Sequence, residues 1–269
     1  SNSVTPQEPV YIEQTFSTYL YTGTGATQTI TNGIDLSTYG GMVWSKARSS
    51  ALSNFLCDTV RGRAYYLYSN ATVAQQGPSG STNDITSFNS NGYSLGTNAN
   101  ADINTNAVTF ASWTFRKQAK FFDVVTYTGN GSGAGQTISH NLGSTPGFII
   151  CKCTSTTQDW AVCARTGGNA SPESGITYAT GLSLNTTAAA GYSGTLGSFP
   201  TSTTFNTAGL FTSAGAYPNL NGQTYVAYLF AHDAGGFGLT GTDNVISCGS
   251  YTGNGSATGP TIKIGRAHV

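Results

Sequence analysis

The chain begins the same short motif three times. The pentapeptide Tyr-Thr-Gly-x-Gly occurs at Tyr21–Gly25, Tyr127–Gly131 and Tyr251–Gly255, and the first two copies start 106 residues apart. A chance match in a chain rich in Gly and Thr would leave the residues behind each copy unrelated. A motif that opens a structural module would be followed by further matches in the same order. This feature therefore decides between one continuous fold and a series of repeated modules.

The stretches behind the first two pentapeptides match block by block. At the offset of 106, Cys57 falls on Cys163 and Lys46 falls on Lys152. The offset grows further along, where the second copy contains additional Gly, Ser and Thr, as expected when loops absorb insertions and strands keep their order. The matched blocks are Gly40–Ala47 with Thr145–Cys153, Asn54–Gly62 with Trp160–Gly168, Tyr66–Asn70 with Leu182–Asn185, Ser87–Leu95 with Thr204–Thr212, and Thr109–Phe115 with Thr224–Phe230.

This order predicts tandem modules. The final six letters, IGRAHV, are read as translated sequencing-adapter DNA, so His268 is left out of any site. The predicted parts are a leading segment 1–18, a first β-sandwich module 19–120, a second 121–238, a linker with the start of a third copy 239–263, and the adapter residues 264–269.

The matched blocks are short, rich in β-branched and aromatic residues, and bounded by Gly, Asn, Ser and Pro. Apolar residues do not recur at helical spacing. We therefore predict an all-β fold of tandem antiparallel β-sandwich modules, jelly-roll-like in type. The pentapeptide itself is interpreted as a hairpin turn, because its glycines permit positive φ, with the following Gln-Thr-Ile as the return strand.

Charged residues make up only 8% of the chain, against about 25% in an average soluble domain, and the net charge is zero. A nucleic-acid partner is excluded, because phosphate binding needs a clustered basic face. No apolar run approaches the roughly 20 residues of a bilayer helix, so membrane insertion is not expected. The five cysteines lack the spacing of a zinc site and are read as buried thiols, and we predict neither a metal nor a cofactor.

No catalytic arrangement is apparent in the sequence. The carboxylates are scattered and most have no acidic counterpart in the other copy, whereas a glycosidase needs two acids facing each other. The spacing of the Ser, His and Asp residues gives no specific indication of a Ser-His-Asp arrangement either. We therefore predict that the protein is not an enzyme.

Aromatic residues are the remaining candidates for ligand binding, because their rings stack on the C–H faces of sugars. Trp113 lies in a repeated strand over Tyr228 and is predicted to be core. Trp160 has only Asn54 over it and is the preferred exposed candidate. The glycan-binding candidates are Trp160, Tyr178 and Tyr65, with the loop Gly167–Gly181, which differs between the copies, as a further ligand loop.

The stretches Phe122–Lys152 and Gly222–Gly238 resemble a repeated β-domain of unknown function found in tail-fibre and appendage proteins of marine bacteriophages. The resemblance covers the second copy from end to end and the start of the third. The first copy departs from it, with Thr-Asn-Gly-Ile-Asp-Leu in place of the His-Asn-Leu-Gly of His140–Gly143, and without the proline. The family supplies no catalytic residues to carry over.

What the resemblance implies is a structural and adhesive role in a virion, outside the host cell. The implied partners are a host-surface glycan or protein receptor, other virion proteins, and further copies of the chain. Two alternatives stay open: a carbohydrate-binding module of a secreted bacterial protein, and a fibre depolymerase. Neighbouring tail genes would favour the virion appendage, and a glycoside hydrolase domain in the same open reading frame would favour the carbohydrate-binding module. Release of oligosaccharide from host polysaccharide would favour the depolymerase.

Overall fold

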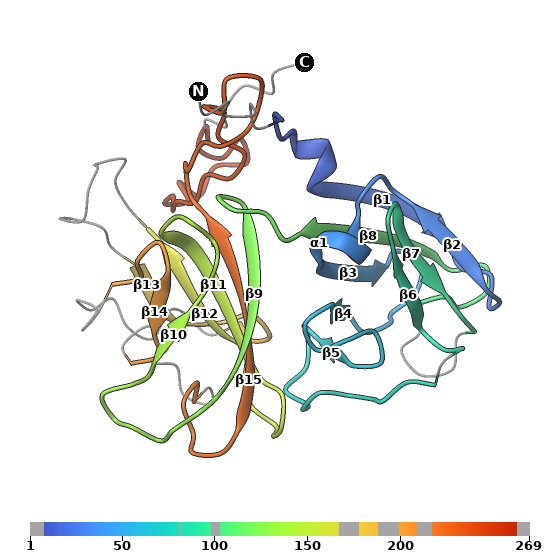
Figure 1. Ribbon diagram of the computed structural model, residues 1–269, viewed down its shortest axis with the longest axis horizontal. Coiled ribbons are helices and arrows are strands. Elements are labelled where there is room, and N and C mark those ends of the chain that lie inside the picture. Colours follow the sequence, from blue (N-terminus) through green and yellow to red (C-terminus); the bar gives the residue numbers. More distant parts are fainter. Residues whose placement is uncertain are drawn as a thin grey trace, which may run out of the picture.

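The computed structural model describes residues 8–80, 82–97, 103–166, 178–187, 199–208 and 217–262. Over these residues the chain is almost entirely β, with one four-residue helix, α1 (Leu36–Tyr39), and one 3-10 turn, Ile12–Gln14. The strands form four antiparallel sheets in two lobes, which Figure 1 shows side by side. The predicted class, all-β with antiparallel sandwiches, is confirmed.

Lobe 1 is built from the strands of the first half of the chain. Its five-stranded sheet has the order β1-β8-β3-β4-β5, and its small sheet has the order β2-β7-β6. The strands are β1 (Phe16–Thr22), β2 (Gln28–Thr31), β3 (Gly41–Ala47), β4 (Phe55–Asp58), β5 (Tyr66–Tyr68), β6 (Ile85–Asn89), β7 (Gly92–Leu95) and β8 (Thr109–Arg116). Because β1 begins at Phe16, the first module starts before the boundary predicted at residue 19.

Lobe 2 repeats this arrangement. Its five-stranded sheet has the order β9-β15-β11-β12-β13, and β10 pairs with β14 in a two-stranded sheet. Strand for strand, the large sheet has the same order as the large sheet of lobe 1. The strands are β9 (Phe122–Thr128), β10 (Thr137–Ser139), β11 (Pro146–Cys153), β12 (Ala161–Arg165), β13 (Tyr178–Ser183), β14 (Thr204–Asn206) and β15 (Thr224–Ala231).

The first two pentapeptides occupy equivalent places in the lobes. Tyr21 of β1 lies opposite Phe110 of β8, and Tyr127 of β9 lies opposite Tyr225 of β15. Strands β8 and β15 are the last strands of their lobes and are called the closing strands below. The rings of the first pair stack with centroids 5.0 Å apart at 11°, and those of the second pair 5.0 Å apart at 12°. The motif therefore marks the same structural position in both halves.

The hairpin interpretation of the pentapeptide is wrong. Strands β1 and β2 lie in different sheets, as do β9 and β10, so the motif carries the chain from the large sheet to the small one. A Cβ on Gly23 would lie 2.2 Å from the carbonyl oxygen of Thr105, and one on Gly129 would lie 2.3 Å from that of Leu220. The glycine is needed for close passage against the turn that precedes the closing strand.

The third pentapeptide keeps its local turn without a sheet. The side-chain oxygen of Asn254 accepts a hydrogen bond from the Ser256 N–H at 3.0 Å, as Asn130 does from Ser132 at 2.9 Å. Tyr251, however, belongs to no strand and its residue is 69% exposed. The turn is thus set by local sequence, whereas burial of the tyrosine depends on a closing strand. The predicted adapter residues 264–269 lie outside the described part of the chain.

One predicted block match needs correction. The sequence placed Thr204–Thr212 on Ser87–Leu95, which puts β14 in the position of β6. In the structure Phe205 lies opposite Ile138, just as Tyr93 lies opposite Ile30. Strand β14 therefore takes the place of β7, because pairing with the second strand of the lobe decides the match.

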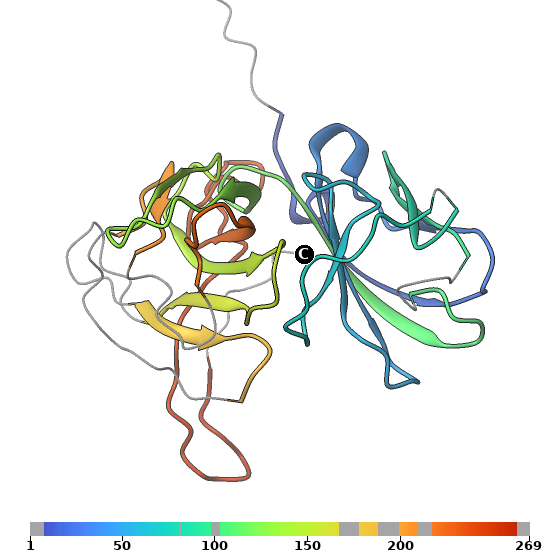
Figure 2. The same ribbon diagram turned by 90° about the horizontal axis from the view of Figure 1, so that it is seen from below.

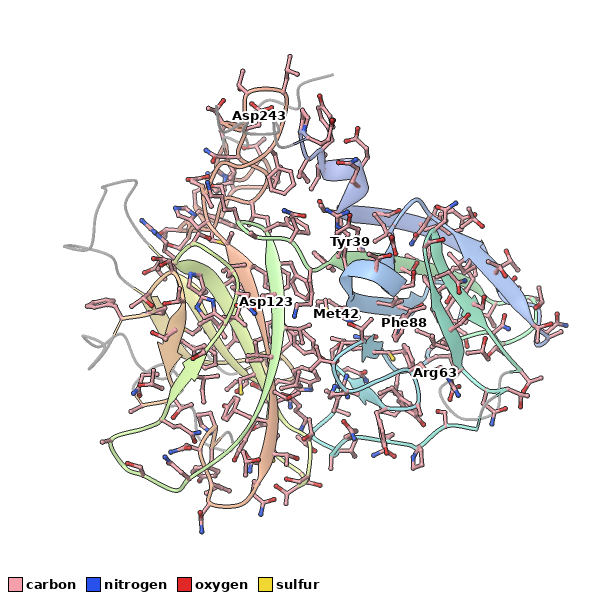
Figure 3. The ribbon with its side chains drawn as sticks, viewed as in Figure 1. Tyr39, Met42, Arg63, Phe88, Asp123 and Asp243 are labelled. Carbon is pink, nitrogen blue, oxygen red and sulfur yellow. The ribbon has the colours of Figure 1, made fainter. Side chains whose placement is uncertain are left out.

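Each lobe has its own core, and a third core lies between them. Successive side chains of a strand point to opposite faces of its sheet. In β3, Val43 joins the core of lobe 1 and Met42 joins the core between the lobes, where Figure 3 places it. In β11, Ile149 and Ile150 divide in the same way. Both large sheets are thus covered on two faces, which explains why most residues of their central strands are buried. Figure 2 shows the two lobes joined along this face.

Candidate functional site

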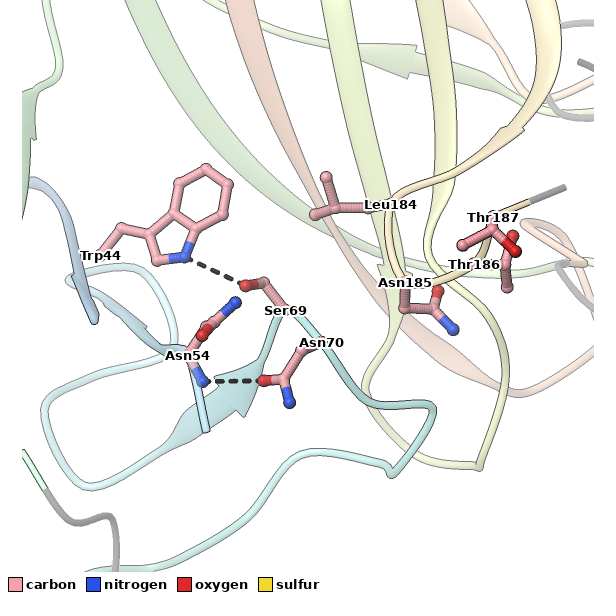
Figure 4. Close-up of a pocket in the computed structure, with 8 residues that line it drawn as sticks. All are labelled: Trp44, Asn54, Ser69, Asn70, Leu184, Asn185, Thr186 and Thr187. Atoms are coloured by element: carbon pink, nitrogen blue, oxygen red, sulfur yellow. Dashed lines mark hydrogen bonds between the residues drawn. The ribbon is translucent and has the colours of Figure 1, made fainter. Parts of the chain in front are cut away.

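A groove of about 320 Å³ opens between the two lobes at the edge of their shared core. Each lobe contributes four residues to it, as Figure 4 shows. Lobe 1 supplies Trp44 from the middle of β3, the residue before β4 and the two residues after β5, and lobe 2 supplies the residues that follow β13. The lining consists of Trp44, Asn54, Ser69, Asn70, Leu184, Asn185, Thr186 and Thr187.

Trp44 is the aromatic wall of this groove. It lies in β3 directly opposite Trp113 of β8, and the two indoles meet edge to face with centroids 6.4 Å apart. The indole N–H of Trp44 donates to the Ser69 hydroxyl at 3.1 Å. Both contacts hold a half-buried ring in one orientation, so the wall is formed before a ligand arrives.

In each lobe, an asparagine side chain accepts a hydrogen bond from the main-chain N–H just before a strand, a contact called a clasp below. The Asn70 side-chain oxygen accepts from the Asn54 N–H at 2.7 Å in lobe 1, and the Asn185 oxygen accepts from the Trp160 N–H at 2.8 Å in lobe 2. Asn185 also donates through Nδ2 to the Asp159 carboxylate at 2.7 Å. The amides are therefore oriented by the fold.

Polar capacity remains for a ligand. Among the described residues, the side-chain amide of Asn54 and the Nδ2 group of Asn70 make no hydrogen bond. The hydroxyls of the exposed Thr186 and Thr187 stand on the opposite rim. An aromatic wall with unpaired amide and hydroxyl groups around it suits an uncharged ligand that has both C–H faces and hydroxyl groups.

The sequence selected different residues for this role, and its first choice is wrong. Trp160 is completely buried between the lobes, where its indole N–H donates to the carbonyl oxygens of Tyr68 at 3.0 Å and Ala71 at 3.1 Å. It cannot stack on a sugar. Trp113, which was assigned to the core, is the half-buried one. Trp160 is thus the more deeply buried of the two tryptophans, the reverse of the prediction. It is buried because lobe 1 covers it.

Of the other candidates, only Tyr65 has a side chain within the described part of the chain. Tyr65 is half-buried in the loop between β4 and β5 and does not line it. The side chain of Tyr178 and most of the loop Gly167–Gly181 lie outside the described residues. Trp44 was missed, although one signal marked it: it falls over Ile150 in the second copy, so the first copy places a large aromatic where the repeat has an aliphatic residue.

A buried polar network holds the lobes together beside this groove. Arg61 binds the fully buried Asp58 carboxylate through Nε at 2.6 Å, and Tyr228 of lobe 2 donates its hydroxyl to the same carboxylate at 2.7 Å. Burial raises the pKa of Tyr228 well above its ordinary value, so its hydroxyl keeps the proton it donates. The ion pair is satisfied by hydrogen bonds within the core, which is the role of a structural contact.

Lys152 is a second buried charge between the lobes. Its ammonium donates to the carbonyl oxygen of Thr72 in lobe 1 at 2.7 Å and to that of Gln158. The equivalent Lys46 makes the matching contact with the carbonyl of Leu52 at 2.7 Å but lacks a partner from the other lobe. Burial lowers the pKa of Lys152 to about 8.

The cluster that most resembles an enzyme site lacks an active nucleophile. The Cys248 N–H donates to Nδ1 of His232 at 2.8 Å, and Nε2 of His232 lies 3.4 Å from the Asp233 carboxylate. Burial raises the pKa of Cys248 to about 11, which keeps the thiol protonated near neutral pH, where nucleophilic cysteines are thiolates. The histidine thus bonds the backbone of the cysteine, and its geometry is that of a loop clasp.

The described residues hold neither a metal-binding cluster nor a membrane-spanning helix. They contain no group of three or more His, Cys, Asp and Glu side chains able to hold a metal ion. They also include no helix of the length and apolar character needed to cross a membrane.

The chain was also compared with known proteins. No curated protein and no solved structure matches it. The sequence model of one protein family matches residues 13–267, a span that includes both lobes and the groove between them. The chain therefore belongs to the family described as domain of unknown function (DUF7483).

Proposed function

We propose that this protein is a non-enzymatic adhesive segment of a virion appendage, and that the groove between its lobes binds a host-surface glycan. The virion setting rests on the resemblance of the second copy to repeated domains of phage appendages. Adhesion rests on the groove itself. A chain with only 8% charged residues is consistent with contact to uncharged partners.

The observation that carries the proposal is the combination of Trp44 with unpaired amides. Sugars are bound by stacking their C–H faces on aromatic rings and by bonding their hydroxyls to amide groups. The Trp44 ring is held in place by Trp113 and Ser69, so little entropy is lost when a ligand stacks on it. The volume of about 320 Å³ lies at the lower end of the roughly 300–1,000 Å³ typical of ligand sites, which suits a small part of a glycan.

The same lining favours binding over cleavage. Hydrolysis of a glycosidic bond needs a pair of carboxyl groups about 5 to 9.5 Å apart, one acting as acid and the other as nucleophile or base. The eight lining residues include no Asp or Glu. A depolymerase working in this groove would find no acid among the described lining residues to protonate the leaving group.

A binding experiment tests the proposal. The purified chain is applied to a glycan array and to intact host cells, alongside Trp44→Ala and Tyr251→Ala. Loss of the stacking wall should weaken binding about tenfold or more, equivalent to roughly 1.4 kcal/mol. Tyr251 is an exposed aromatic in the third pentapeptide, outside the groove, so its substitution should have no effect.

Two results would contradict adhesion in the groove. The wild-type chain could bind neither glycans nor host envelopes, or both variants could bind as weakly as each other, which would indicate non-specific aromatic contacts. The setting is tested separately by labelling particles with an antibody against the chain. Labelled virions support the appendage, and a secreted bacterial product that carries the chain supports a carbohydrate-binding module.

A further inference from the structure

The two lobes contact each other through equivalent corners. In lobe 2 the corner is the start of β12, where the Trp160 N–H is clasped by Asn185. The indole of Trp160 extends across the boundary onto the residues that follow β5 in lobe 1, and it donates to the carbonyls of Tyr68 and Ala71. This is one half of an exchange between the lobes.

The reciprocal half is the groove. Asn54 occupies the position of Trp160 in lobe 1, because its N–H is clasped by Asn70 in the same way. Thr186 follows Asn185 as Ala71 follows Asn70, and both Asn54 and Thr186 line the groove. The groove is therefore the lobe 1 counterpart of the contact that Trp160 makes. It is open because Asn54 stands at the position where lobe 2 has the indole.

From this correspondence we infer that the groove is a slot for a single ring, and that its occupant is one neutral pyranose residue of a glycan. The inference rests on the proposed function and narrows it to a ligand class. The ring lies in the space that an indole takes on the other side of the boundary, with one face against Trp44. Asn54 is the residue that keeps the slot open.

The polar lining favours a sugar ring over an aromatic side chain of a partner protein. An indole has one donor, and Trp160 satisfies it with main-chain carbonyls. The slot instead offers the complete amide of Asn54, the Nδ2 group of Asn70 and two threonine hydroxyls. A ring with several hydroxyls pairs with these groups, whereas an indole would leave most of them unpaired.

The charges around the slot favour a neutral sugar. None of the eight lining side chains is charged. Next to the lining lie one basic and one acidic residue. Lys46 is two residues from Trp44 in β3, and Asp159 accepts a hydrogen bond from Asn185. An acidic sugar would find no cation among the eight lining side chains to replace its lost hydration.

The substitution Asn54→Trp tests the slot directly. It places an indole at the position in lobe 1 that is equivalent to Trp160 in lobe 2, and this indole should fill the groove. The backbone of Asn54 already makes the clasp that Trp160 makes, and its amide has no partner to lose. We expect an unchanged or higher melting temperature and at least a tenfold loss of binding to methyl glycosides of glucose, galactose and mannose, measured by saturation-transfer NMR. Asn54→Ala, which leaves the slot open but removes one amide that faces the sugar, should weaken binding less than Asn54→Trp does.

A second blocking variant covers the case in which Asn54→Trp does not fold. Thr186 is exposed, so Thr186→Arg closes the opposite rim without touching a core. If wild type binds a glycan on the array and both folded blocking variants bind it equally well, the slot inference is overturned while adhesion stands. If wild type binds no glycan at all, the proposed function itself fails. Stronger binding of methyl glucuronide, or of N-acetyltryptophanamide in place of sugars, would overturn the neutral-pyranose assignment.

Discussion

The cores inside the two lobes are built from equivalent residues, whereas the faces that the lobes turn toward each other differ. Inside each sandwich, equivalent positions hold equivalent residues: Cys57 lies opposite Val43 in lobe 1, and Cys163 lies opposite Ile149 in lobe 2. Both cysteines are completely buried. The small sheet packed on each large sheet imposes the same demands twice, so the same residue types recur.

The faces turned toward the other lobe differ because each has a different neighbour. Trp160 stands where lobe 1 has Asn54, and Asp58 stands where lobe 2 has Ala164 on the matched strand. These differences are complementary: Asp58 receives the hydroxyl of Tyr228, and Trp160 covers Ala71. A duplicated unit thus becomes a two-lobed unit through substitutions on one face of each large sheet.

The largest expected effect comes from making lobe 2 resemble lobe 1 at this boundary. Trp160→Asn removes a fully buried indole that bonds two carbonyls, and truncation of a buried Trp costs about 3–5 kcal/mol. We expect the free energy of unfolding, measured with urea, to fall by about 4 kcal/mol. The matched variant Asn54→Ala should change it by less than about 0.5 kcal/mol, since the Asn54 side chain makes no hydrogen bond to the described residues. Equal losses at the two positions would break the comparison.

A smaller effect distinguishes the two equivalent lysines by pH. The pKa of Lys152 is lowered by burial to about 8 from its usual 10.5. Below pH 8 the lysine is charged in both the folded and the unfolded protein, and the cost of burying its charge is fully present. Between about pH 8 and 10.5 the folded protein releases the proton first, so stability rises with pH until the cost is gone.

This sign is measured as a difference, because buried thiols act in the opposite direction. Burial raises the pKa of Cys151 and Cys163 to about 12, which lowers stability as pH rises above 9, the usual thiol value. Relative to Lys152→Met, wild type should gain about 1 kcal/mol of unfolding free energy between pH 8 and pH 9. The matched Lys46→Met variant serves as control. If the curves of wild type and Lys152→Met run parallel across this range, the buried charge has no such cost.

The sequence predicts what is repeated in this fold, because sandwich interiors repeat. Column matching placed Tyr21 with Tyr127 and Lys46 with Lys152, and the structure gives both pairs the same contacts. It cannot distinguish a Gly-rich segment that reverses within one sheet from one that crosses between two sheets. The reason is that both require glycine, and only the partner of Gly23, the carbonyl of Thr105, separates them.

The candidate site was harder to predict, because it is made by the contact between lobes. Trp160 was expected to be exposed because the first copy has Asn54, and no aromatic residue, at the matched position. Trp44 lies in the middle of a mostly buried strand, and nothing local shows that its side chain borders an opening. The useful signal was the mismatch between copies, since Asn54 over Trp160 is the substitution that opens the groove.

The smallest expected effect sharpens the comparison where the lobes agree best. The Tyr21 hydroxyl donates to the Ile103 carbonyl at 2.8 Å and lies 2.9 Å from the Ser45 hydroxyl, while the Tyr127 hydroxyl donates to the Pro218 carbonyl at 2.7 Å. Each change to Phe removes one buried hydrogen bond, worth about 1 kcal/mol. In lobe 2 the second partner is a thiol, a weaker acceptor than a serine hydroxyl, so Tyr127→Phe should be the milder of the two by a few tenths of a kcal/mol.

Urea unfolding of both variants at pH 7 measures these costs. Burial raises the pKa of both tyrosines, so each hydroxyl is a neutral donor at that pH and no titration contributes. Losses that agree within about 0.5 kcal/mol would mean that the pentapeptide does the same work in both lobes. A loss above about 2 kcal/mol in one lobe alone would show that its closing turn depends on the tyrosine in a way that the other does not, and the equivalence would then hold for geometry but not for energy.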